Sequence, residues 1–444
     1  MKCPFHPPGP TSKIPGLLYL SLRRDPLGFL QRAVRRFGDF VHLQIGPRHD
    51  CLVNDPEQIK KILLARSGYA RSSARALRRL LGQGLLTSDG EYHARQRKTI
   101  QPIFQQQQTA WAAVMLDCAA RLRDQWQPGA EVDVTEEMMN LARGIIIKVV
   151  LALDLEQEDG ALLKVLEVVC KATNQNTFPT LAELLSKFPF SSAHRLRKSI
   201  RELDLMLYRM IAARRARPTA GSDFLSCLIA ARNPDDGAGL TDQQVRDELL
   251  TMIVAGHETI GNALSWTWYL LSQNPAAEAR LHAEVETVLQ GRPPTAEDCP
   301  RLTYVGMVFA ESLRLYPPVW ILPRRPLHGS RVGEYDMPAG SYFQLCPYIT
   351  QRDARNFPDP ERFDPERWTP EQTATRHRFS YFPFASGQHK CIGETFSRSE
   401  GILALATLAQ KWTLRLVPGH RVVLAPLITL RSKYGMRMTL HPRT

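Results

Sequence analysis

The spacing of apolar residues along the chain predicts a mainly helical protein. Over most of the sequence apolar positions recur every three or four residues, which is the pattern of an amphipathic helix. Asn274 and Pro275 separate two of these helices, because proline is tolerated at a helix start and not inside a helix. The predicted helices are Pro26–Phe37, Pro56–Ala65, Gln108–Gln125, Val134–Ala152, Arg195–Ala213, Thr241–Gln273, Ala276–Leu289 and Tyr304–Leu315.

Strand patterns are fewer and lie near the two ends of the chain. Asp39–Ile45 alternates apolar and polar positions and is followed by Gly46–Pro47, which predicts a strand that pairs with Cys51–Val53. Further strands are expected at Ser341–Leu345 and, as a C-terminal pair, at Thr413–Val417 and Met436–Leu440. The sequence therefore predicts a large helical body with small β regions near 39–53, 341–345 and 413–440.

The chain shows no Gly/Ser/Pro-rich linker, so we expect residues 1–444 to form one compact unit. The segment Asn356–Trp368 contains three prolines among charged and aromatic residues, which predicts a rigid, irregular coil. With 444 residues, 43% of them hydrophobic, the chain can bury a large core.

Charge and cysteine usage limit the expected binding partners and the expected cellular compartment. The net charge of +13 is spread along the chain, which favours either an ordinary solvated basic surface or an acidic protein partner, and not nucleic acid. Eight scattered cysteines without a CxxC pair indicate reduced thiols in the cytoplasm. The apolar run Gly144–Leu155 is short and contains Lys148, so we expect a buried helix and no membrane anchor.

The most informative segment surrounds Cys391. Phe384, Gly387, Cys391 and Gly393 stand at fixed spacing directly before an amphipathic helix pattern. A thiolate is favoured at a helix N-terminus, and the glycines let the backbone turn tightly around a large flat group. A single cysteine at a helix start is usually structural, but the four positions together favour a ligand. His389 and Lys390 are expected to add positive charge nearby.

This stretch resembles the haem-binding loop of the cytochrome P450 family. The resemblance implies the mainly helical haem-thiolate fold with a small β region, and haem b (iron protoporphyrin IX) as the cofactor. It implies that Cys391 is the axial thiolate of the iron, a ligand that favours O–O cleavage. Many relatives have an arginine that contacts a haem propionate at the position of His389.

A second segment lies in the middle of the predicted helix Thr241–Gln273. A glycine there costs about 1 kcal/mol relative to alanine, and a threonine hydroxyl competes for backbone carbonyls. These costs suggest a functional site, in which the glycine lets a diatomic ligand approach the backbone; the alternative is a glycine packing contact. The residues are Ala255, Gly256, His257, Glu258 and Thr259.

The resemblance extends to this segment and assigns roles to two of its residues. It implies that Thr259 directs protons to bound oxygen and that Glu258 relays protons inward, as positioned acid–base groups do. His257 is expected to be a neighbouring packing or surface residue.

Glu311 and Arg314 share one face of a predicted helix, because they are three residues apart. Such a pair alone is common and weak, but it resembles the Glu-x-x-Arg element of the family. The third partner is expected to be Arg367 and not Arg362, because only Arg367 follows the family order of aromatic, variable residue, Pro, Glu and Arg. The resemblance implies that this set holds the loop that carries Cys391.

Other basic residues are candidates for the haem propionates. His93 and Arg97 are four residues apart in a short basic helix pattern, which predicts either a charge-assisted clamp or a solvated helix face. Arg324 matches a further propionate-binding arginine of the family, with its neighbour Arg325 as the alternative.

The resemblance also points to an apolar substrate pocket. Its residues suit a terpenoid, a fatty acid or a steroid-like compound. Phe178, Phe188 and Phe190 either line the entrance or belong to the core. The expected pocket residues are Val254, Val319, Trp320, Ile321 and Ile428.

Together these motifs imply a monooxygenase that inserts one oxygen atom from O₂ into an apolar small molecule. The two electrons are expected from an external donor, a ferredoxin with its reductase, for which a basic surface including Lys390 and Arg398 is suited. A peroxide-driven peroxygenase, a haem isomerase or a haem-based binding or sensing protein are the alternatives. Glu258 and Thr259 argue against the peroxygenase and the isomerase.

Overall fold

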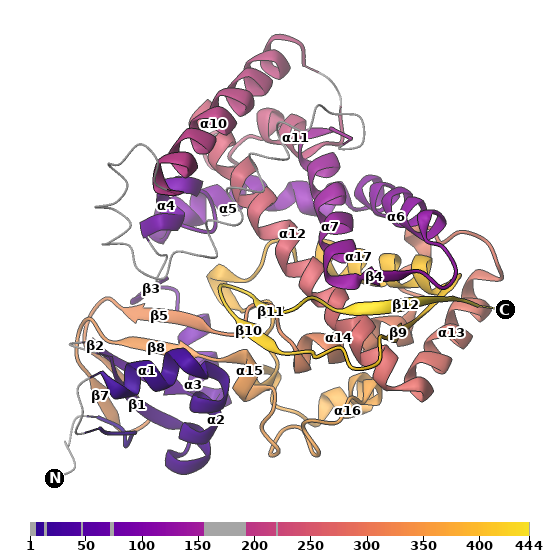
Figure 1. Ribbon diagram of the computed structural model, residues 1–444. Coiled ribbons are helices and arrows are strands. Elements are labelled where there is room, and N and C mark those ends of the chain that lie inside the picture. The colour runs from indigo at the N-terminus through magenta and orange to yellow at the C-terminus, as the bar shows by residue number, and fades with distance from the viewer. Residues whose placement is uncertain are drawn as a thin grey trace.

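The computed structural model describes residues 6–12, 16–45, 48–71, 75–154, 192–218 and 221–443, so Phe178, Phe188 and Phe190 lie outside the described residues. Figure 1 shows a helical body beside a smaller region that holds the largest sheet. The α-helices described are α1 (Leu17–Arg24), α2 (Pro26–Phe37), α3 (Pro56–Leu64), α4 (Arg75–Leu81), α5 (Gly90–Gln106), α6 (Gln108–Gln125), α7 (Val134–Leu151), α10 (Ser192–Ala216), α11 (Phe224–Ala230), α12 (Asp242–Gln273), α13 (Pro275–Leu289), α14 (Thr303–Leu315), α15 (Pro347–Thr350), α16 (Pro370–Ala374) and α17 (Glu394–Ala409).

All eight predicted helices are confirmed, with ends that shift by at most three residues. The sequence missed α1, α4 and α11, which have eight or seven residues each and are too short to show a helical period. It also predicted only part of α5, because Pro102 lies inside that helix and proline normally marks an end.

The largest sheet has five strands in the order β1-β2-β8-β5-β3. The predicted pair of strands near 39–53 is confirmed as the antiparallel hairpin of β1 and β2. Strand β8 lies next to β2 in the sheet and runs parallel to it. The sequence missed β5, which contains two prolines and reads as a poor strand. The strands are β1 (Phe40–Ile45), β2 (Arg48–Val53), β3 (Tyr69–Arg71), β5 (Leu322–Pro326) and β8 (Tyr342–Leu345), and β6 (Ser330–Val332) pairs with β7 (Tyr335–Met337).

The C-terminal strands lie against the helical body. The predicted pair is confirmed as β9 (Trp412–Leu416) and β12 (Arg437–Pro442), which are antiparallel and joined by β4 (Glu131–Asp133). A hairpin of β10 (Leu424–Pro426) and β11 (Leu430–Ser432) lies beside α12 in Figure 1. The indole of Trp266 on α12 donates to the carbonyl of Leu430 (3.0 Å), which fixes the hairpin to this helix.

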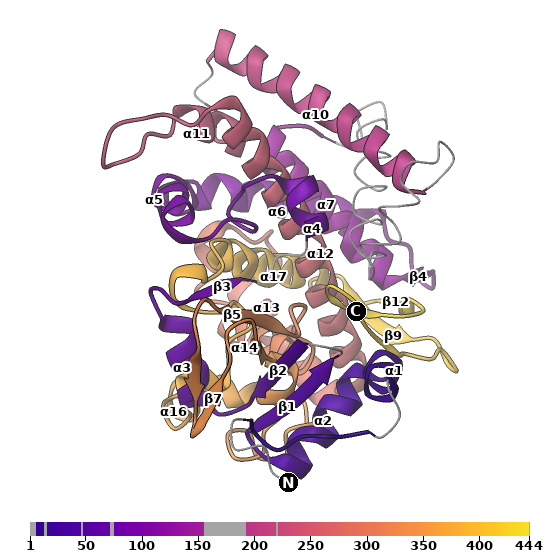
Figure 2. The same cartoon turned by 90° about the vertical axis from the view of Figure 1, so that its left-hand side faces the viewer.

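Helix α12 runs through the centre of the helical body in both views (Figures 1 and 2). A capping box of Thr241 and Gln244 begins it, and Asn274 follows its last residue. It packs closely on α7, where a Cβ at Gly261 would lie 2.7 Å from the sulfur of Met139. This helix therefore provides a fixed wall for the site.

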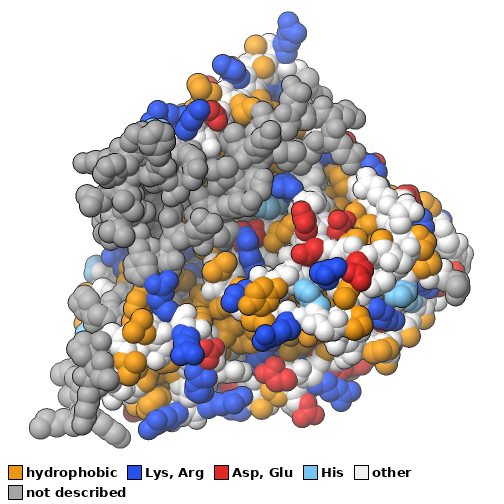
Figure 3. All heavy atoms as spheres, in the orientation of Figure 1, with side chains coloured by type: hydrophobic (Ala, Val, Ile, Leu, Met, Phe, Trp, Pro, Cys, Tyr) orange, Lys and Arg blue, Asp and Glu red, His pale blue; other side chains and the backbone are white. Residues whose placement is uncertain are grey.

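The surface carries both signs of charge. Figure 3 shows Lys and Arg side chains spread over one face, with Asp and Glu side chains among them. Among the described residues, Cys51, Cys118, Cys227, Cys299, Cys346 and Cys391 are free thiols. No helix in the described ranges is both long and apolar enough to cross a membrane.

Candidate active site

The loop that carries Cys391 is held by its own backbone. The amide of Cys391 donates to the carbonyl of Phe384 (2.9 Å), and the amide of Lys390 donates to that of Gly387 (3.0 Å). Gly387 has a φ of +69°, and a Cβ there would lie 2.0 Å from the carbonyl oxygen of Leu63. Only glycine fits this position, so the predicted tight turn is confirmed.

Cys391 lines an internal space. Its side chain is exposed by surface area, yet surrounding protein raises the pKa of its thiol through burial, an effect partly offset by the backbone N–H of Gly393. A group that is accessible and also surrounded by protein lies in a cavity. A Cβ at Gly393 would stand 4.0 Å from the sulfur of Cys391, so this glycine keeps the space beside the sulfur free.

His93 and Arg97, one turn apart on α5, both contact the Cys391 loop. Arg97 donates to the carbonyl of Lys390, and the Nε2 of His93 lies 3.3 Å from the Nδ1 of His389. His93 is buried, so the alternative of a solvated helix face is wrong for this residue. Its Nδ1 is buried and has no hydrogen-bond partner in the structure, which leaves a donor or acceptor for a further group.

The two histidines of this cluster have lowered pKa values, which opposes the positive charge expected at His389. Burial, followed by the charge of Arg71, lowers the pKa of His389 to about 2 and that of His93 to about 3. The Nε2 of His389 lies 3.4 Å from the carboxylate of Asp89. At neutral pH this contact joins an uncharged ring to a carboxylate and is not an ion pair.

Two buried arginines complete the cluster from strands that are distant in sequence. Arg71 on β3 pairs directly with Arg324 on β5, and their mutual repulsion contributes, after burial, to a lowered pKa of about 10 for Arg324. The carboxylate of Asp89 lies 3.5 Å from the Nε of Arg71, and its negative charge also acts on Arg324. Arg325 is exposed, so the structure places Arg324, and not its neighbour, in the cluster. Sequence spacing could not have found Arg71.

The middle of α12 is accessible while its flanks are buried. Residues 245–253 and 260–268 are buried, and the turn between them is partly open. A partly open turn inside a buried helix marks a second wall of an internal space. The partly open residues are Val254, Ala255, Gly256, His257 and Thr259.

Within this turn the threonine and the glycine serve different purposes. The hydroxyl of Thr259 donates to the carbonyl of Ala255 (2.8 Å), so its oxygen lone pairs stay free to accept a hydrogen bond. A Cβ at Gly256 would lie 2.7 Å from the Cδ1 of Ile146 on α7. This contact supports the alternative of a glycine packing contact, because the glycine makes room for the neighbouring helix, and the approach of a diatomic ligand at this position stays a prediction.

Glu258 points away from Thr259 and toward the C-terminal hairpin. Its carboxylate is buried, accepts hydrogen bonds from Thr429 and from Arg431 (Nε, 2.8 Å), and forms an ion pair with Arg431 (Nη2, 2.6 Å). Asn262, one turn further along α12, donates to Thr429 (3.1 Å). Sequence reasoning missed Thr429 and Arg431, because they lie more than 170 residues from Glu258 and no spacing rule connects them.

The predicted network of Glu311, Arg314 and Arg367 is formed. Both Glu311 and Arg314 are completely buried, and two hydrogen bonds of 2.8 Å join them. The Nε of Arg367 lies 3.4 Å from Glu311, a charge contact too long for a good hydrogen bond. The indole of Trp368 also donates to Glu311 (2.9 Å), and Arg362 contributes only its carbonyl, to Arg314 (3.0 Å).

Gln351 and Tyr381 connect this network to the chain that precedes Cys391. Gln351 donates to the carbonyl of Arg314 and accepts from the amide of Phe382 (3.0 and 3.1 Å). Tyr381 donates to the carbonyl of Ala310 on α14 (3.2 Å). Helix α14 is thus attached to the approach of the cysteine loop at several points.

The predicted substrate residues lie in different settings. Val319 and Ile321 are half-buried, and Ile428 is 50% exposed between β10 and β11. Trp320 is buried in a cluster with Leu27 and Leu30, and its indole donates to the carbonyl of Leu427 (2.9 Å). These contacts give Trp320 a packing role that the sequence did not suggest.

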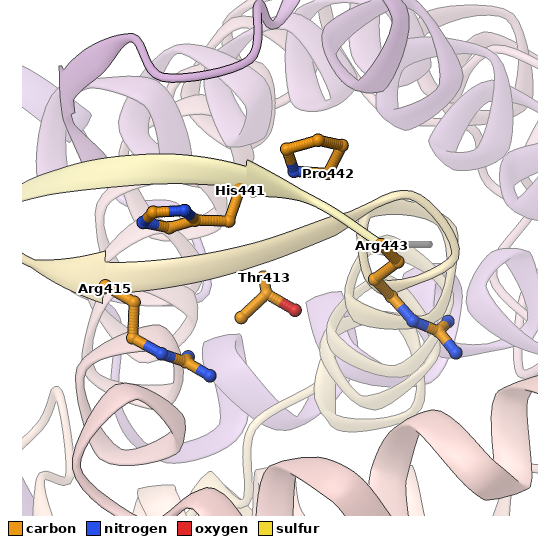
Figure 4. A pocket seen from close by; sticks show the side chains of 5 residues that line it. All are labelled: Thr413, Arg415, His441, Pro442 and Arg443. Carbon is orange, nitrogen blue, oxygen red and sulfur yellow. The ribbon is translucent and has the colours of Figure 1, made fainter.

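A separate pocket lies at the ends of β9 and β12, away from these walls (Figure 4). Its arginines are already engaged, since Arg415 pairs with Glu278 (2.6 Å) and Arg443 donates to the carbonyl of Ala409 (2.8 Å). It contains no residue of α12 or of the cysteine loop and is not the predicted active site. Its lining is Thr413, Arg415, His441, Pro442 and Arg443.

Comparisons with known proteins agree with this geometry. Residues 7–430 match the family model described as cytochrome P450. The chain is 36% identical to cyclooctatin synthase of Streptomyces melanosporofaciens over 96% of this chain and 93% of that protein. It is 31% identical to pentalenene oxygenase of Streptomyces avermitilis, over 95% and 94% of the two chains. The crystal structure of the cytochrome P450DA heme domain superposes with a TM-score of 0.89 at 24% identity, covering 99% of this chain and 98% of that one.

The fold and the cysteine loop define a haem-thiolate protein, and the chain belongs to the cytochrome P450 family. It is a monooxygenase with haem b as its cofactor, and it takes O₂, an apolar substrate and electrons from an external donor. The residues present fit the cofactor. An accessible cysteine sulfur stands beside a space kept free by Gly393, and a cluster rich in arginine and histidine contains an unpartnered His93 nitrogen suited to anionic propionates.

Proposed function

We propose that this enzyme oxidises an apolar terpenoid with electrons from a ferredoxin and its reductase. The observation that carries the proposal is the accessible turn of α12 in an otherwise buried helix, combined with an accessible cysteine in the loop before α17. The two relatives reported above are named for cyclooctatin and pentalenene. A hydrocarbon-like substrate suits the half-buried apolar side chains of Val254, Val319 and Ile321.

In this proposal the haem is held by its iron ligand and by its propionates. Cys391 is the iron ligand, and Phe384 packs beside it. Arg97, Arg324 and His93 bind the propionates, with His389 as a hydrogen-bonding neighbour. His389 offers two ring nitrogens where an arginine would offer five N–H donors, so it can make fewer hydrogen bonds to a propionate.

When bound, the haem supplies the activation of O₂ and the transfer of one oxygen atom to the substrate. Thr259 serves as the proton-positioning group, because its hydroxyl is fixed by Ala255 and its lone pairs face the accessible turn. Glu258 is the reservoir for protons, and Arg431 holds its carboxylate in place until it takes one up. Neighbouring side chains on a helix do not face each other, so a proton that passes from Glu258 to Thr259 needs a water molecule between them.

The ferredoxin proposal rests on basic residues around the cysteine loop. Lys390 and Arg398 both contact Glu394, at 2.7 and 3.0 Å, so this group carries one net positive charge. Exposed charges of this kind mainly set the rate of association and its dependence on salt. The cytoplasmic location and the operation of residues 1–444 as one haem unit remain predictions.

The test is reconstitution of turnover with purified protein. We expect a strongly red-shifted Soret band with CO after reduction, and hydroxylated product from sesquiterpene or diterpene hydrocarbons when ferredoxin, its reductase and NADPH are supplied. A fatty acid and a steroid serve as controls for the substrate class. Product with peroxide alone would favour the peroxygenase, and CO binding without product from any of these compounds would favour a sensing protein.

A further inference from the structure

Three histidines gather at the N-terminal edge of the five-stranded sheet, far from the residues assigned above. His42 on β1 and His49 on β2 occupy diagonal positions of the antiparallel hairpin, and His6 belongs to the segment that precedes α1. The ring centroid of His6 lies 4.6 Å from that of His42 and 4.8 Å from that of His49. One ligand atom of each ring lies within 4.8 Å of the others.

The backbone brings His6 to the hairpin by a specific close approach. The amide of His42 donates to the carbonyl of Pro8 (3.0 Å), so the N-terminal segment runs along β1. A Cβ at Gly9 would lie 1.9 Å from the carbonyl oxygen of His42, and only glycine allows the two backbones to lie so near each other. The position of the His6 ring therefore follows from backbone contacts and not from its own side chain alone.

We propose that His6, His42 and His49 bind one divalent ion of the zinc class and thereby fasten the N-terminal segment to the β1–β2 hairpin. Imidazole is a preferred ligand of Zn²⁺, Cu²⁺ and Ni²⁺. Three protein ligands leave a fourth position for water. Among the described residues this is the one cluster of three or more His, Cys, Asp or Glu side chains that can hold a metal ion.

The three rings have to rotate to hold one ion, because they lie nearly parallel, at 4°, 10° and 12° to one another, and their ligand atoms are up to 4.8 Å apart. The Nε2 of His42 and the Nδ1 of His49 are 2.9 Å apart and share one hydrogen. Two nitrogens on a tetrahedral zinc, with Zn–N bonds of about 2.0–2.1 Å, are separated by about 3.3 Å. The ring that donates this hydrogen can move its proton to its other nitrogen, and the ion then takes the place of the hydrogen between the two rings. Both imidazoles therefore stay neutral and no proton is released.

One nitrogen of the cluster is open to a ligand. Among the described residues, the Nδ1 of His6 is buried without a hydrogen-bond partner, which is a cost that a bound ion would remove. A neutral imidazole keeps one nitrogen lone pair that can bind a metal.

The test uses Zn²⁺ with untagged holoenzyme that has been treated with a chelator and dialysed. We expect saturable binding of one Zn²⁺ per chain by isothermal titration, and slower proteolysis of the N-terminal segment when Zn²⁺ is present. His6→Ala removes one ligand outside any strand and should weaken binding by more than about tenfold. The double variant H42A/H49A should lose the saturable site. His328→Ala, an exposed histidine outside the cluster, is the matched control and should bind like the parent.

Each outcome decides the proposal. The CO spectrum of every variant reports whether the fold and the haem site are intact, and this readout does not depend on the metal. If the double variant does not fold, His6→Ala decides alone. The absence of a stoichiometric site in the parent protein, or equal Zn²⁺ affinity in the parent and in His6→Ala, would overturn the assignment.

Discussion

The two walls of the proposed haem pocket are stabilised in different ways. On the cysteine side, Glu311 and Arg314 are fully buried and backbone contacts fix the loop. On the α12 side, Glu258 is held by Arg431, whose side chain is 30% exposed and lies on a hairpin with the half-exposed Ile428. A fully buried ion pair cannot open without leaving an unpaired charge, whereas water can replace a partly exposed partner. The difference suggests a rigid wall for the iron ligand and an adjustable wall for oxygen and substrate.

The largest effect should come from removal of the sulfur. We expect Cys391→Ala to abolish monooxygenase turnover and to remove the red-shifted Soret band of the reduced CO complex, because no other ligand gives the iron thiolate character. Cys227→Ala is the matched control, since this thiol makes only a weak contact with Gly221 (3.9 Å). A native CO spectrum from Cys391→Ala would disprove the ligand assignment.

The rigidity of the cysteine wall can be tested at Arg314. Arg314→Met leaves Glu311 buried without its main partner, so we expect a loss of about 3–5 kcal/mol in the free energy of unfolding. Urea denaturation followed by tryptophan fluorescence and haem absorbance measures it. Lys60→Met breaks an exposed pair with Glu57 and should change stability by about 1 kcal/mol or less. Similar values for both variants would contradict the rigidity assigned to the cysteine wall.

The chemical role of the α12 wall is tested at Thr259. Thr259→Ala should lower the amount of product formed per NADPH several-fold. Oxygen is still consumed in this variant, but it is reduced to peroxide or water. Thr267→Ala is a close control, because its hydroxyl makes the same contact one turn back, with Ala263 (2.7 Å), at a buried position. Equal amounts of product per NADPH in the parent and in Thr259→Ala would exclude this hydroxyl from proton delivery.

The smallest effect is expected at Arg431. Arg431→Met releases the carboxylate of Glu258 from its ion pair. We expect product per NADPH to fall by less than in Thr259→Ala. Substrate should also bind more weakly, because the hairpin is less firmly held. Arg437→Met removes a different, exposed pair, with Glu131, and is the control for charge alone. If both variants behave as the parent does, the hairpin does not hold the proton-carrying group.

Sequence reasoning succeeded where the interacting residues are close in the chain. Helical periods placed α12 and α14, and the spacing of Glu311 and Arg314 identified a pair that is buried. It failed for contacts that only the folded chain creates, such as Arg71 opposite Arg324. It also could not name the packing partner of Gly256, because that neighbour, Ile146, lies on a different helix.

The facing arginines of β3 and β5 have a consequence for the cell. Like charges directly opposite each other weaken a pair of strands, so Arg71 and Arg324 work against the edge of the sheet until anions neutralise them. Ligands that bind only the folded state raise its stability, and haem with its two propionates is such a ligand. We expect newly made chains to close this edge late, when haem arrives, and unloaded chains to be degraded first. Iron and porphyrin supply would then limit how much of this enzyme accumulates at a given level of gene expression.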